Sequence, residues 1–498
     1  MTQASLNAAD EQASIKSIIA PLVAIIVGMF MVILDGTAMN VAMPRLINDF
    51  QSPISVVQWT VTGYALAQSA VIPLAGWLSD RFGAKRIFLF SVIMFTIGSA
   101  LCALAASAEQ LIVYRIIQGL GGGMVSPIAM AFTYRLSPPG KVGAVMGMIG
   151  IPMLLAPALG PVLSGWLVDF ATWHWIFLIN VPVGVIAVII ALRTLPNIER
   201  QTVPALDYLG MFFAPLAFAM LAYGVSSAGG EAGQGNGWTS TQTVTGITVG
   251  VIALIVFIFV ELRRSHPLLE LRVFGSGNFT RGIVVQWIAT IALFGTMFLV
   301  PLLLQQAKGY SAFTTGLIML PQALSAAIFM PIGGRLYDRI GARPVVIAGL
   351  SIVTVAGFLL SRLAPDTSLA MIMLPLAMLG SGMGLSMMPL NTHIIQSSPA
   401  HLVSRVTSLT GAAQQVMVSF AVAGLSTILA NRIEHYSAAE RGPQMLYSSF
   451  GDTFLVMAGI AIAGAALGFM LRRPRPKPKP AGERKADGQA EAGMMMGH

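Results

Sequence analysis

The sequence contains few charged residues for its length. Asp, Glu, Lys and Arg make up 10% of its 498 residues, whereas 55% are hydrophobic and the mean hydropathy is +0.77. Soluble domains carry about 25% charged residues, so this composition excludes a soluble fold and predicts a surface that faces lipid. The net charge of +9 does not indicate a nucleic-acid partner, because the basic residues lie between long apolar runs.

Residues that carry catalytic or metal chemistry are equally scarce. The single cysteine, Cys102, excludes an intrachain disulfide, and the six histidines show no H-E-x-x-H or comparable metal-ligand spacing. The one Gly-Lys pair, Gly140-Lys141, lacks the first glycine of an ATP-binding G-x-x-x-x-G-K-[ST] loop, and no G-x-S-x-G motif occurs. We therefore expect no metal site, no enzymatic activity and no ATP-driven mechanism.

Long apolar runs dominate the sequence instead. A membrane-spanning helix needs about 20 apolar residues. Fourteen stretches qualify: 18–41, 55–78, 87–106, 111–134, 142–168, 175–195, 206–226, 243–262, 279–306, 316–337, 344–363, 369–392, 404–430 and 452–471. They are too long for strands and do not alternate, so we predict an all-α polytopic membrane protein. No small-residue cleavage site follows the first run, which we expect to be retained as a span.

The basic residues are distributed unevenly between the two sides of the predicted membrane protein. When the N-terminus is placed in the cytoplasm, 23 of the 29 Lys and Arg residues fall on the cytoplasmic side, five fall outside and Arg115 lies within a span. This asymmetry fits the positive-inside rule. It predicts an even number of spans with both termini cytoplasmic.

An internal repeat divides the chain. GWLSDRFGAKR (76–86) and GRLYDRIGARP (334–344) match at an offset of 258 residues, after the second and the tenth span. Two helices are therefore inserted between two six-helix halves. The predicted organisation is a cytoplasmic N-terminus (1–17), an N-terminal six-helix bundle (18–200), two inserted helices with linkers (201–272), a C-terminal six-helix bundle (273–471) and a basic, proline-rich cytoplasmic tail (472–498).

These segments resemble the major facilitator superfamily. GWLSDRFGAKR is similar to its loop 2–3 signature, LIVYRIIQGLGGG (111–123) to the fourth-helix motif of proton-coupled members, and APALGPVLSG (156–165) to the antiporter motif of the fifth helix. LDGTAMNVAMP (34–44) and WHWIFLINVPVG (173–184) resemble the fourteen-helix drug–proton antiporters of the QacA/EmrB type. The sequence departs from these motifs at Ala156, Ser164 and His174, where two glycines and an arginine are usual.

The resemblance implies a function and a location. It implies a proton-coupled multidrug efflux antiporter of the bacterial inner (cytoplasmic) membrane, which exports lipophilic, neutral or cationic compounds by alternating access. Protons and membrane lipids would be its other partners, and the proton gradient would drive it without a cofactor. A dedicated exporter of one metabolite, antibiotic or lipid in the same fold is the alternative. Some relatives use a periplasmic adaptor protein, but no segment here indicates one.

Two charged residues lie deep inside predicted spans, away from the span ends. At 1.5 Å per residue, Asp35 lies about 10 Å from the outer end of the first helix, and Arg115 lies about 6–8 Å from the outer end of the fourth. Intramembrane charges usually face the bundle interior, where they pair or mark an ion path. We expect Asp35 to bind the coupling proton and Arg115 to tune its affinity. The alternative is that Asp35 is a fixed structural partner of Thr37 or Asn40.

Other motifs predict moving parts. By resemblance, the two Asp-Arg-x-Gly segments form a conformational latch between the halves; the alternative is that their basic residues only hold the loops in the cytoplasm. The latch candidates are Asp80, Arg81, Gly83, Asp338, Arg339 and Gly341. The fifth helix contains Pro157, Gly160 and Pro161. Proline kinks a helix and glycine permits close approach, so we predict a bent gating helix.

The substrate cavity is expected between the halves, near the membrane midplane. Candidate lining residues lie on six predicted spans: Gln58, Trp59, Tyr64, Gln118, Gln286, Met297, Phe298, Gln305, Gln322, Asn391, Gln414 and Gln415. The alternative for each is ordinary helix packing. No acidic residue lies deep in the ninth to thirteenth spans, which favours neutral or monocationic substrates and a low proton stoichiometry.

Overall fold

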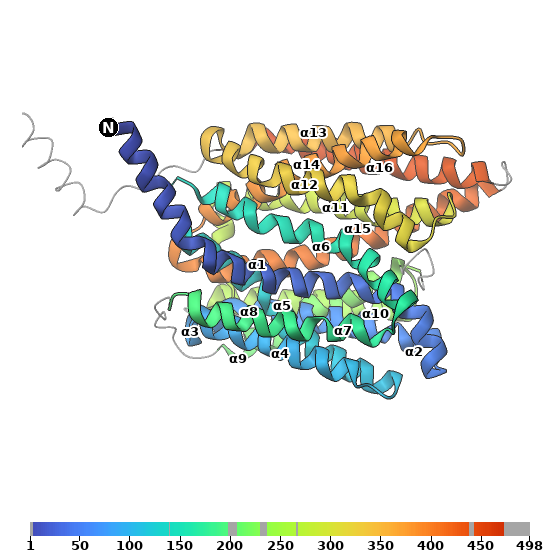
Figure 1. The fold of residues 1–498 in the computed structure, drawn as a ribbon, viewed down its shortest axis with the longest axis horizontal. Helices are drawn as coiled ribbons and strands as arrows, with labels where there is room; N and C mark the ends of the chain where they lie inside the picture. Colours follow the sequence, from blue (N-terminus) through green and yellow to red (C-terminus); the bar gives the residue numbers. More distant parts are fainter. Residues whose placement is uncertain are drawn as a thin grey trace, which may run out of the picture.

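The computed structural model describes residues 3–138, 140–197, 207–229, 237–264, 267–437 and 443–472. Within these ranges, fourteen helices are long and apolar enough to cross a membrane, which confirms the fourteen predicted spans. Figure 1 shows the helices running side by side along the long axis of the molecule. The predicted basic tail lies outside the described residues beyond its first residue.

The first six spans form a group that we call the N half. Its helices are α1 (Gln3–Phe50), α2 (Ile54–Val57), α3 (Trp59–Phe82), α4 (Ala84–Ala103), α5 (Ala108–Leu136), α6 (Val142–Phe170), α7 (His174–Leu178) and α8 (Asn180–Thr194). The second span was predicted at 55–78 but runs from Trp59 to Phe82. It is shifted because the chain breaks between α2 and α3, and because the Asp-Arg pair stays helical up to a glycine.

The remaining spans form the insert and the C half. The insert consists of α9 (Tyr208–Gly229) and α10 (Thr241–Arg263). The C half consists of α11 (Gly277–Gln306), α12 (Ala312–Ile340), α13 (Ala342–Leu360), α14 (Leu369–Gln396), α15 (Val403–Ser437) and α16 (Pro443–Gly468). Short 3-10 helices, η2 (Leu271–Gly275) and η3 (Ala400–Leu402), precede α11 and α15.

Two glycines of the repeat end α3 and α12 in the same way. Gly83 has φ 95° and Gly341 has φ 86°, a conformation that residues with a Cβ rarely adopt. Each glycine therefore stops one helix and lets the next begin immediately. We call the end of the bundle at which Gly83 and Gly341 lie the signature end, and the opposite end the far end.

Glycines also bring α5 against its neighbours in the N half. A Cβ on Gly119 would lie 2.6 Å from the carbonyl oxygen of Tyr64 on α3, and one on Gly121 would lie 2.6 Å from the backbone nitrogen of Phe95 on α4. A Cβ on Gly98 of α4 would lie 2.7 Å from the Cα of Gln118. Small residues allow such backbone contact between membrane helices, so α3, α4 and α5 form one tightly packed unit.

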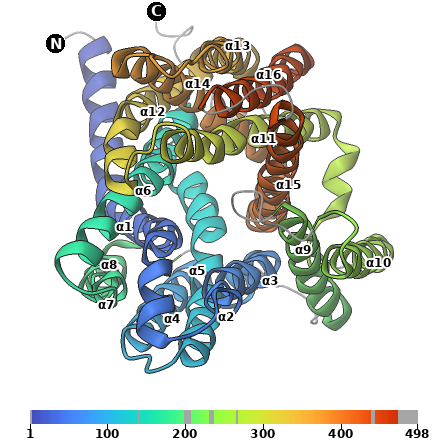
Figure 2. The ribbon, with the colours of Figure 1, turned by 90° about the vertical axis from the view of Figure 1, so that its right-hand side faces the viewer.

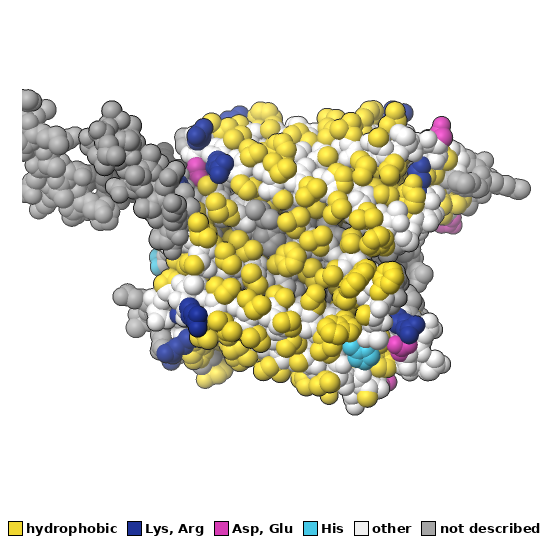
Figure 3. Space-filling model, in the orientation of Figure 1, with side chains coloured by type: hydrophobic (Ala, Val, Ile, Leu, Met, Phe, Trp, Pro, Cys, Tyr) yellow, Lys and Arg dark blue, Asp and Glu magenta, His cyan; other side chains and the backbone are white. Residues whose placement is uncertain are grey.

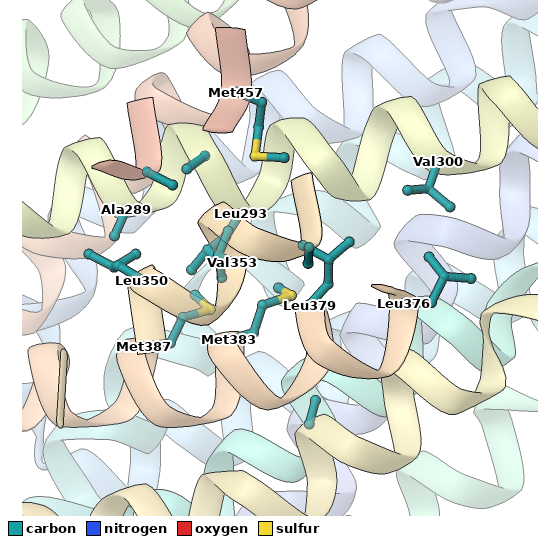
Figure 4. Packing of buried hydrophobic residues seen from close by; sticks show 14 of the residues in the cluster. Ala289, Leu293, Val300, Leu350, Val353, Leu376, Leu379, Met383, Met387 and Met457 are labelled. Atoms are coloured by element: carbon teal, nitrogen blue, oxygen red, sulfur yellow. The ribbon is translucent and has the colours of Figure 1, made fainter. Parts of the chain in front are cut away.

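The C half is held together by aliphatic and methionine side chains. Figure 4 shows them meeting between α11, α13, α14 and α16 (Ala289, Leu293, Val300, Leu350, Val353, Leu376, Leu379, Met383, Met387 and Met457). Such a core packs by dispersion contacts between buried side chains. The cluster also takes in Ala131 of α5 and Met146 of α6, and a second cluster forms between α1, α3, α4, α5 and α8 in the N half.

The outer surface is apolar where it would meet lipid. On the face drawn in Figure 3, hydrophobic side chains cover the middle of the molecule, and Lys and Arg side chains appear near its two ends. Figure 2 shows the insert at the edge of the bundle, beside α3 of the N half and α15 of the C half, against both of which α9 packs.

Candidate functional site

A buried ion pair lies inside the N half. The Asp35 and Arg115 side chains are both 0% exposed, and Nη1 of Arg115 donates to Oδ2 of Asp35 at 2.5 Å. Asp35 comes from α1 and Arg115 from α5, two spans that were predicted to place these charges at similar depth. A charge-assisted hydrogen bond of this kind gains strength in a dry, low-dielectric site.

Neutral donors complete the shell of the Asp35 carboxylate. Its Oδ1 accepts from Nε2 of Gln118 at 3.1 Å and from Nδ2 of Asn180 at 2.8 Å. Both amides also donate to the Ser99 hydroxyl, at 3.1 Å and 3.0 Å, and Ser99 in turn donates to the carbonyl oxygen of Phe177 at 3.0 Å. The carboxylate thus has three buried donors from two helices, Arg115 and Gln118 of α5 and Asn180 of α8.

The guanidinium of Arg115 has its own partners. Its Nε donates to the Thr60 carbonyl oxygen at 3.1 Å, and Nη1 also donates to Oε1 of Gln118 at 2.8 Å. Its Cζ lies 3.8 Å from the centre of the Tyr64 ring, a cation–π contact. The remaining nitrogen, Nη2, is buried without a hydrogen-bond partner. Removing Asp35 would therefore leave a desolvated cation, which is costly.

Two sequence expectations about these residues are corrected. Tyr64 and Gln118 were expected to line a substrate cavity, but they are buried around the ion pair, because α3 and α5 pack so closely. Thr37 was an alternative partner of Asp35, but its hydroxyl donates to the Leu34 carbonyl oxygen at 3.0 Å in its own helix. The side chain of the other alternative, Asn40, lies outside the described residues.

Asn180 is a member of this site that the sequence reasoning missed. It is 2% exposed and begins α8, directly after the break that separates α8 from α7. The signal was present, since an amide in the apolar run WHWIFLINVPVG needs a partner. Its role was not assigned because only the fold brings α8 against α1.

A second polar cluster lies at the signature end, around Asp80. One oxygen of its buried carboxylate lies 3.3 Å from Nη2 of Arg135, and the other lies 3.7 Å from Nε of Arg405. Arg135 also donates to the Ser404 hydroxyl at 2.8 Å. Asp80 and Arg135 belong to the N half, whereas Ser404 and Arg405 begin α15 of the C half. The cluster therefore joins the two halves.

The second copy of the repeat makes the reciprocal connection. Asp338 of the C half accepts from the backbone amides of Gly143 and Ala144 at 2.9 Å and 3.0 Å. These amides open α6 of the N half, where a carboxylate is favoured by the unpaired donors and the helix dipole. Each half thus presents its Asp to the start of a helix in the other half.

Close backbone contacts accompany both connections. A Cβ on Gly76 would collide with the Ser404 carbonyl oxygen, and one on Gly334 would collide with that of Gly143. Gly76 and Gly334 are equivalent positions of the repeat. The arginines that directly follow the two aspartates, Arg81 and Arg339, are exposed.

The proline- and glycine-containing helix α6 lies between the halves. It packs against α1 of the N half and against α12 of the C half. A Cβ on Gly160 would collide with the Thr37 hydroxyl, so this glycine permits the contact with α1. Pro157 is half-buried, and the side chain of Pro161 lies outside the described residues. The bend predicted for this helix stays a prediction.

The other cavity candidates do not gather in one place. Gln286 donates to Asn391 at 2.8 Å, and Gln322 meets the sulfur of Met383 at 3.7 Å. The rest are placed apart: Met297 and Phe298 pack on the core of the C half, Gln414 and Gln415 are half-buried on α15, and Gln58, Trp59 and Gln305 are exposed. Trp59 stacks on Tyr223 of the insert, with ring centres 6.2 Å apart, because it faces α9.

The geometry defines a class of protein. Fourteen apolar helices, a buried ion pair and two reciprocal contacts between repeated halves describe a membrane transporter built from two bundles. Among the described residues, no group of three or more His, Cys, Asp and Glu side chains could hold a metal ion.

The chain belongs to the major facilitator superfamily, whose family description matches residues 25–422. It is therefore a transporter of small molecules rather than an enzyme, and a multi-pass protein of the inner membrane. It is 36% identical over 403 residues to the multidrug resistance protein B homolog of Mycobacterium tuberculosis (strain ATCC 25618 / H37Rv), covering 80% of this chain and 74% of the relative.

Further comparisons agree with this assignment. The chain is 32% identical over 422 residues to the lincomycin resistance protein LmrB of Listeria innocua, covering 84% of this chain and 88% of the relative. A solved structure of the proton:xylose symporter XylE superimposes with a TM-score of 0.58 at 15% sequence identity, covering 89% of this chain and 94% of that one. At that identity the likeness shows the shared fold.

Proposed function

We propose that this protein is a proton-coupled multidrug efflux antiporter, and that Asp35 carries the coupling proton. The observation that supports this most directly is the buried Asp35 carboxylate, held by Arg115 and two amides in the membrane-spanning part of the chain. Drug efflux is further supported by similarity to proteins named for multidrug and lincomycin resistance.

In the proposed cycle, protonation changes what Asp35 binds. A charged carboxylate accepts from Arg115, Gln118 and Asn180, whereas a neutral carboxyl group needs an acceptor for its own proton. Proton binding therefore loosens the network that joins α1, α5 and α8. Release of the proton restores that network and returns the transporter to the state seen here. The proton gradient would drive this cycle without a cofactor.

The signature end supplies the gate in this proposal. Asp80 and Asp338 each hold the start of a helix in the opposite half, so the halves are joined at this end. Opening it would break these contacts, as alternating access requires. We propose that the signature end and both termini are cytoplasmic, since this end carries the excess of basic residues.

The proposed substrates are lipophilic and neutral or monocationic. No acidic residue lies deep in the ninth to thirteenth spans, so the C half offers amide and apolar groups but no fixed negative charge at that depth. A divalent cation would lack the paired carboxylates that usually compensate it. Protons and membrane lipids would be the other partners, and no adaptor protein is proposed.

The proposal is tested by ethidium transport in proteoliposomes under an imposed pH gradient. We expect wild-type protein to move ethidium and Asp35→Asn to lose gradient-driven transport. Asp452→Asn is the matched control, because the half-buried Asp452 pairs with the exposed Arg432, 3.4 Å away. Gradient-driven transport by Asp35→Asn at the wild-type rate would refute the coupling role.

A second measurement separates loss of coupling from loss of folding. Asp35→Asn leaves Arg115 buried without its counter-charge, which can cost about 3–5 kcal/mol. Ethidium exchange without a pH gradient, and the double variant Asp35→Asn/Arg115→Gln, show whether the protein still binds and moves the dye. Wild-type protein that moves no ethidium would favour the dedicated exporter instead.

A further inference from the structure

The insert lies at the junction of the two halves. On one side α9 packs against α3 of the N half, and on the other against α15 of the C half (Figure 2). All three meet in one apolar cluster (Ile72 and Trp77 of α3, Ala214, Phe218 and Leu221 of α9, and Val406, Leu409, Ala412 and Val416 of α15). When the halves move relative to each other, the insert must follow one of them and slide against the other.

Hydrogen bonds join the insert to the C half near the far end. The Ser226 hydroxyl of α9 donates to the Ser419 hydroxyl of α15 at 3.4 Å. Nε1 of Trp238, just before α10, donates to the Thr427 hydroxyl of α15 at 2.8 Å. Hydrogen bonds are directional and fix the register of two helices.

The insert is joined to the C half at the signature end as well. Glu261 of α10 is 1% exposed, and its Oε1 accepts from the backbone amide of Leu268 at 3.0 Å. Arg405 of α15 donates from Nη1 to the carbonyl oxygen of Pro267 at 3.0 Å. The short segment that contains Pro267 and Leu268 is thus held from one side by the insert and from the other by the C half.

The contacts described between the insert and the N half are of a different kind. Near the far end, Trp59 of α3 stacks on Tyr223 of α9 at an interplanar angle of 24°. Towards the signature end, Ile72 and Trp77 of α3 meet Phe218 of α9 in the apolar cluster. Apolar contact is non-directional, and stacked rings slide over one another at little cost.

We infer that the insert is carried by the C half as one body, and that the face between α3 and α9 is the surface that slides during transport. This inference rests on the alternating-access part of the proposed function. In this inference α9 and α10 have a role in the transport motion, because they enlarge the C half and keep it in contact with α3.

Cross-linking tests the inference, because the chain has a single cysteine to remove. In a Cys102→Ser background, one variant carries Ser226→Cys/Ser419→Cys, joining α9 to the C half, and a second carries Trp59→Cys/Tyr223→Cys, joining α9 to the N half. Both are treated with the same short bifunctional reagent, which joins the two thiols through disulfide bonds that a reductant breaks. Ethidium transport is then measured before treatment, after treatment and after reduction.

We expect the first cross-link to leave transport within about twofold of the reduced protein, and the second to lower it about tenfold or more until it is reduced, since it blocks a gating motion. Block by the first cross-link, equal block by both, or no effect of either would overturn the inference. If wild-type protein moves no ethidium, the proposed function is at fault and not the assignment of the insert.

Distances between spin labels test whether the insert moves with the C half, and they require no transport assay. Thr239→Cys on the insert is paired with Asp366→Cys in the C half or with Ala106→Cys in the N half, all at exposed positions. Between pH 8 and pH 5.5, we expect the distance to the C half to stay constant and the distance to the N half to change. A changed distance to the C half, or no change in either, contradicts the inference.

Discussion

Replacing Asn180 by Leu isolates one donor to the Asp35 carboxylate. Leu has a similar volume, so it removes the 2.8 Å hydrogen bond without opening space for a replacing water. A hydrogen bond to a charged group contributes about 1.5–3 kcal/mol, and one pH unit corresponds to about 1.4 kcal/mol. Because this donor favours the charged carboxylate, its loss favours the protonated form. The pH of half-maximal transport should rise by about one to two units.

The assay is the initial rate of ethidium transport in proteoliposomes as a function of pH. The control is Asn391→Leu, which removes a buried amide that pairs with Gln286 in the C half. The control variant can lower the rate but should leave the shape of the pH profile unchanged. A profile that does not move for Asn180→Leu, or that moves to lower pH, would refute the reasoning.

Two other substitutions test the gate and the ion pair. Gly334→Ala places a methyl group against the backbone of α6, so the signature end should fail to close and ethidium efflux should fall about tenfold. The control Gly459→Ala, whose added methyl group meets nothing within 4 Å, should transport normally. Equal efflux rates for the two variants would contradict the proposed gate. Tyr64→Leu removes the aromatic ring 3.8 Å from Arg115 and should destabilise the purified protein by about 1–2 kcal/mol in thermal unfolding relative to Tyr64→Phe, which keeps the ring. Equal stability of the two variants would show that the cation–π contact contributes nothing.

The spans and the ion pair follow from simple rules that act along single helices. Hydropathy over about 20 residues locates each span. The rise per residue places Asp35 and Arg115 at matching depths, and burial then favours their meeting. The repeat around Asp80 and Asp338 likewise indicates a related role for both, because similar segments fold alike in each half.

The rest depends on how helices rotate and pack, which no local pattern encodes. Gln118 and Trp59 both met the criterion for a cavity residue, a polar or aromatic side chain on a span. Gln118 faces Asp35, however, whereas Trp59 faces the insert. Asn180 becomes a ligand of Asp35 only because α8 packs on α1. Arg405 contacts both Asp80 and the segment after α10, a convergence of three distant parts of the chain.

The glycine contacts of α5 constrain how the proton gradient can do work. Asp35 and Arg115 both belong to the N half, and α5 is locked to α3 and α4 at backbone distance. Because the two charges lie in the same half, rocking of one half against the other leaves their separation unchanged. In the proposed cycle, the proton gradient acts through the hydration free energy of the Asp35 carboxylate. This site stays in place within the N half and opens to water on alternate sides of the membrane. The protein converts energy by wetting and drying one carboxylate rather than by pulling opposite charges apart.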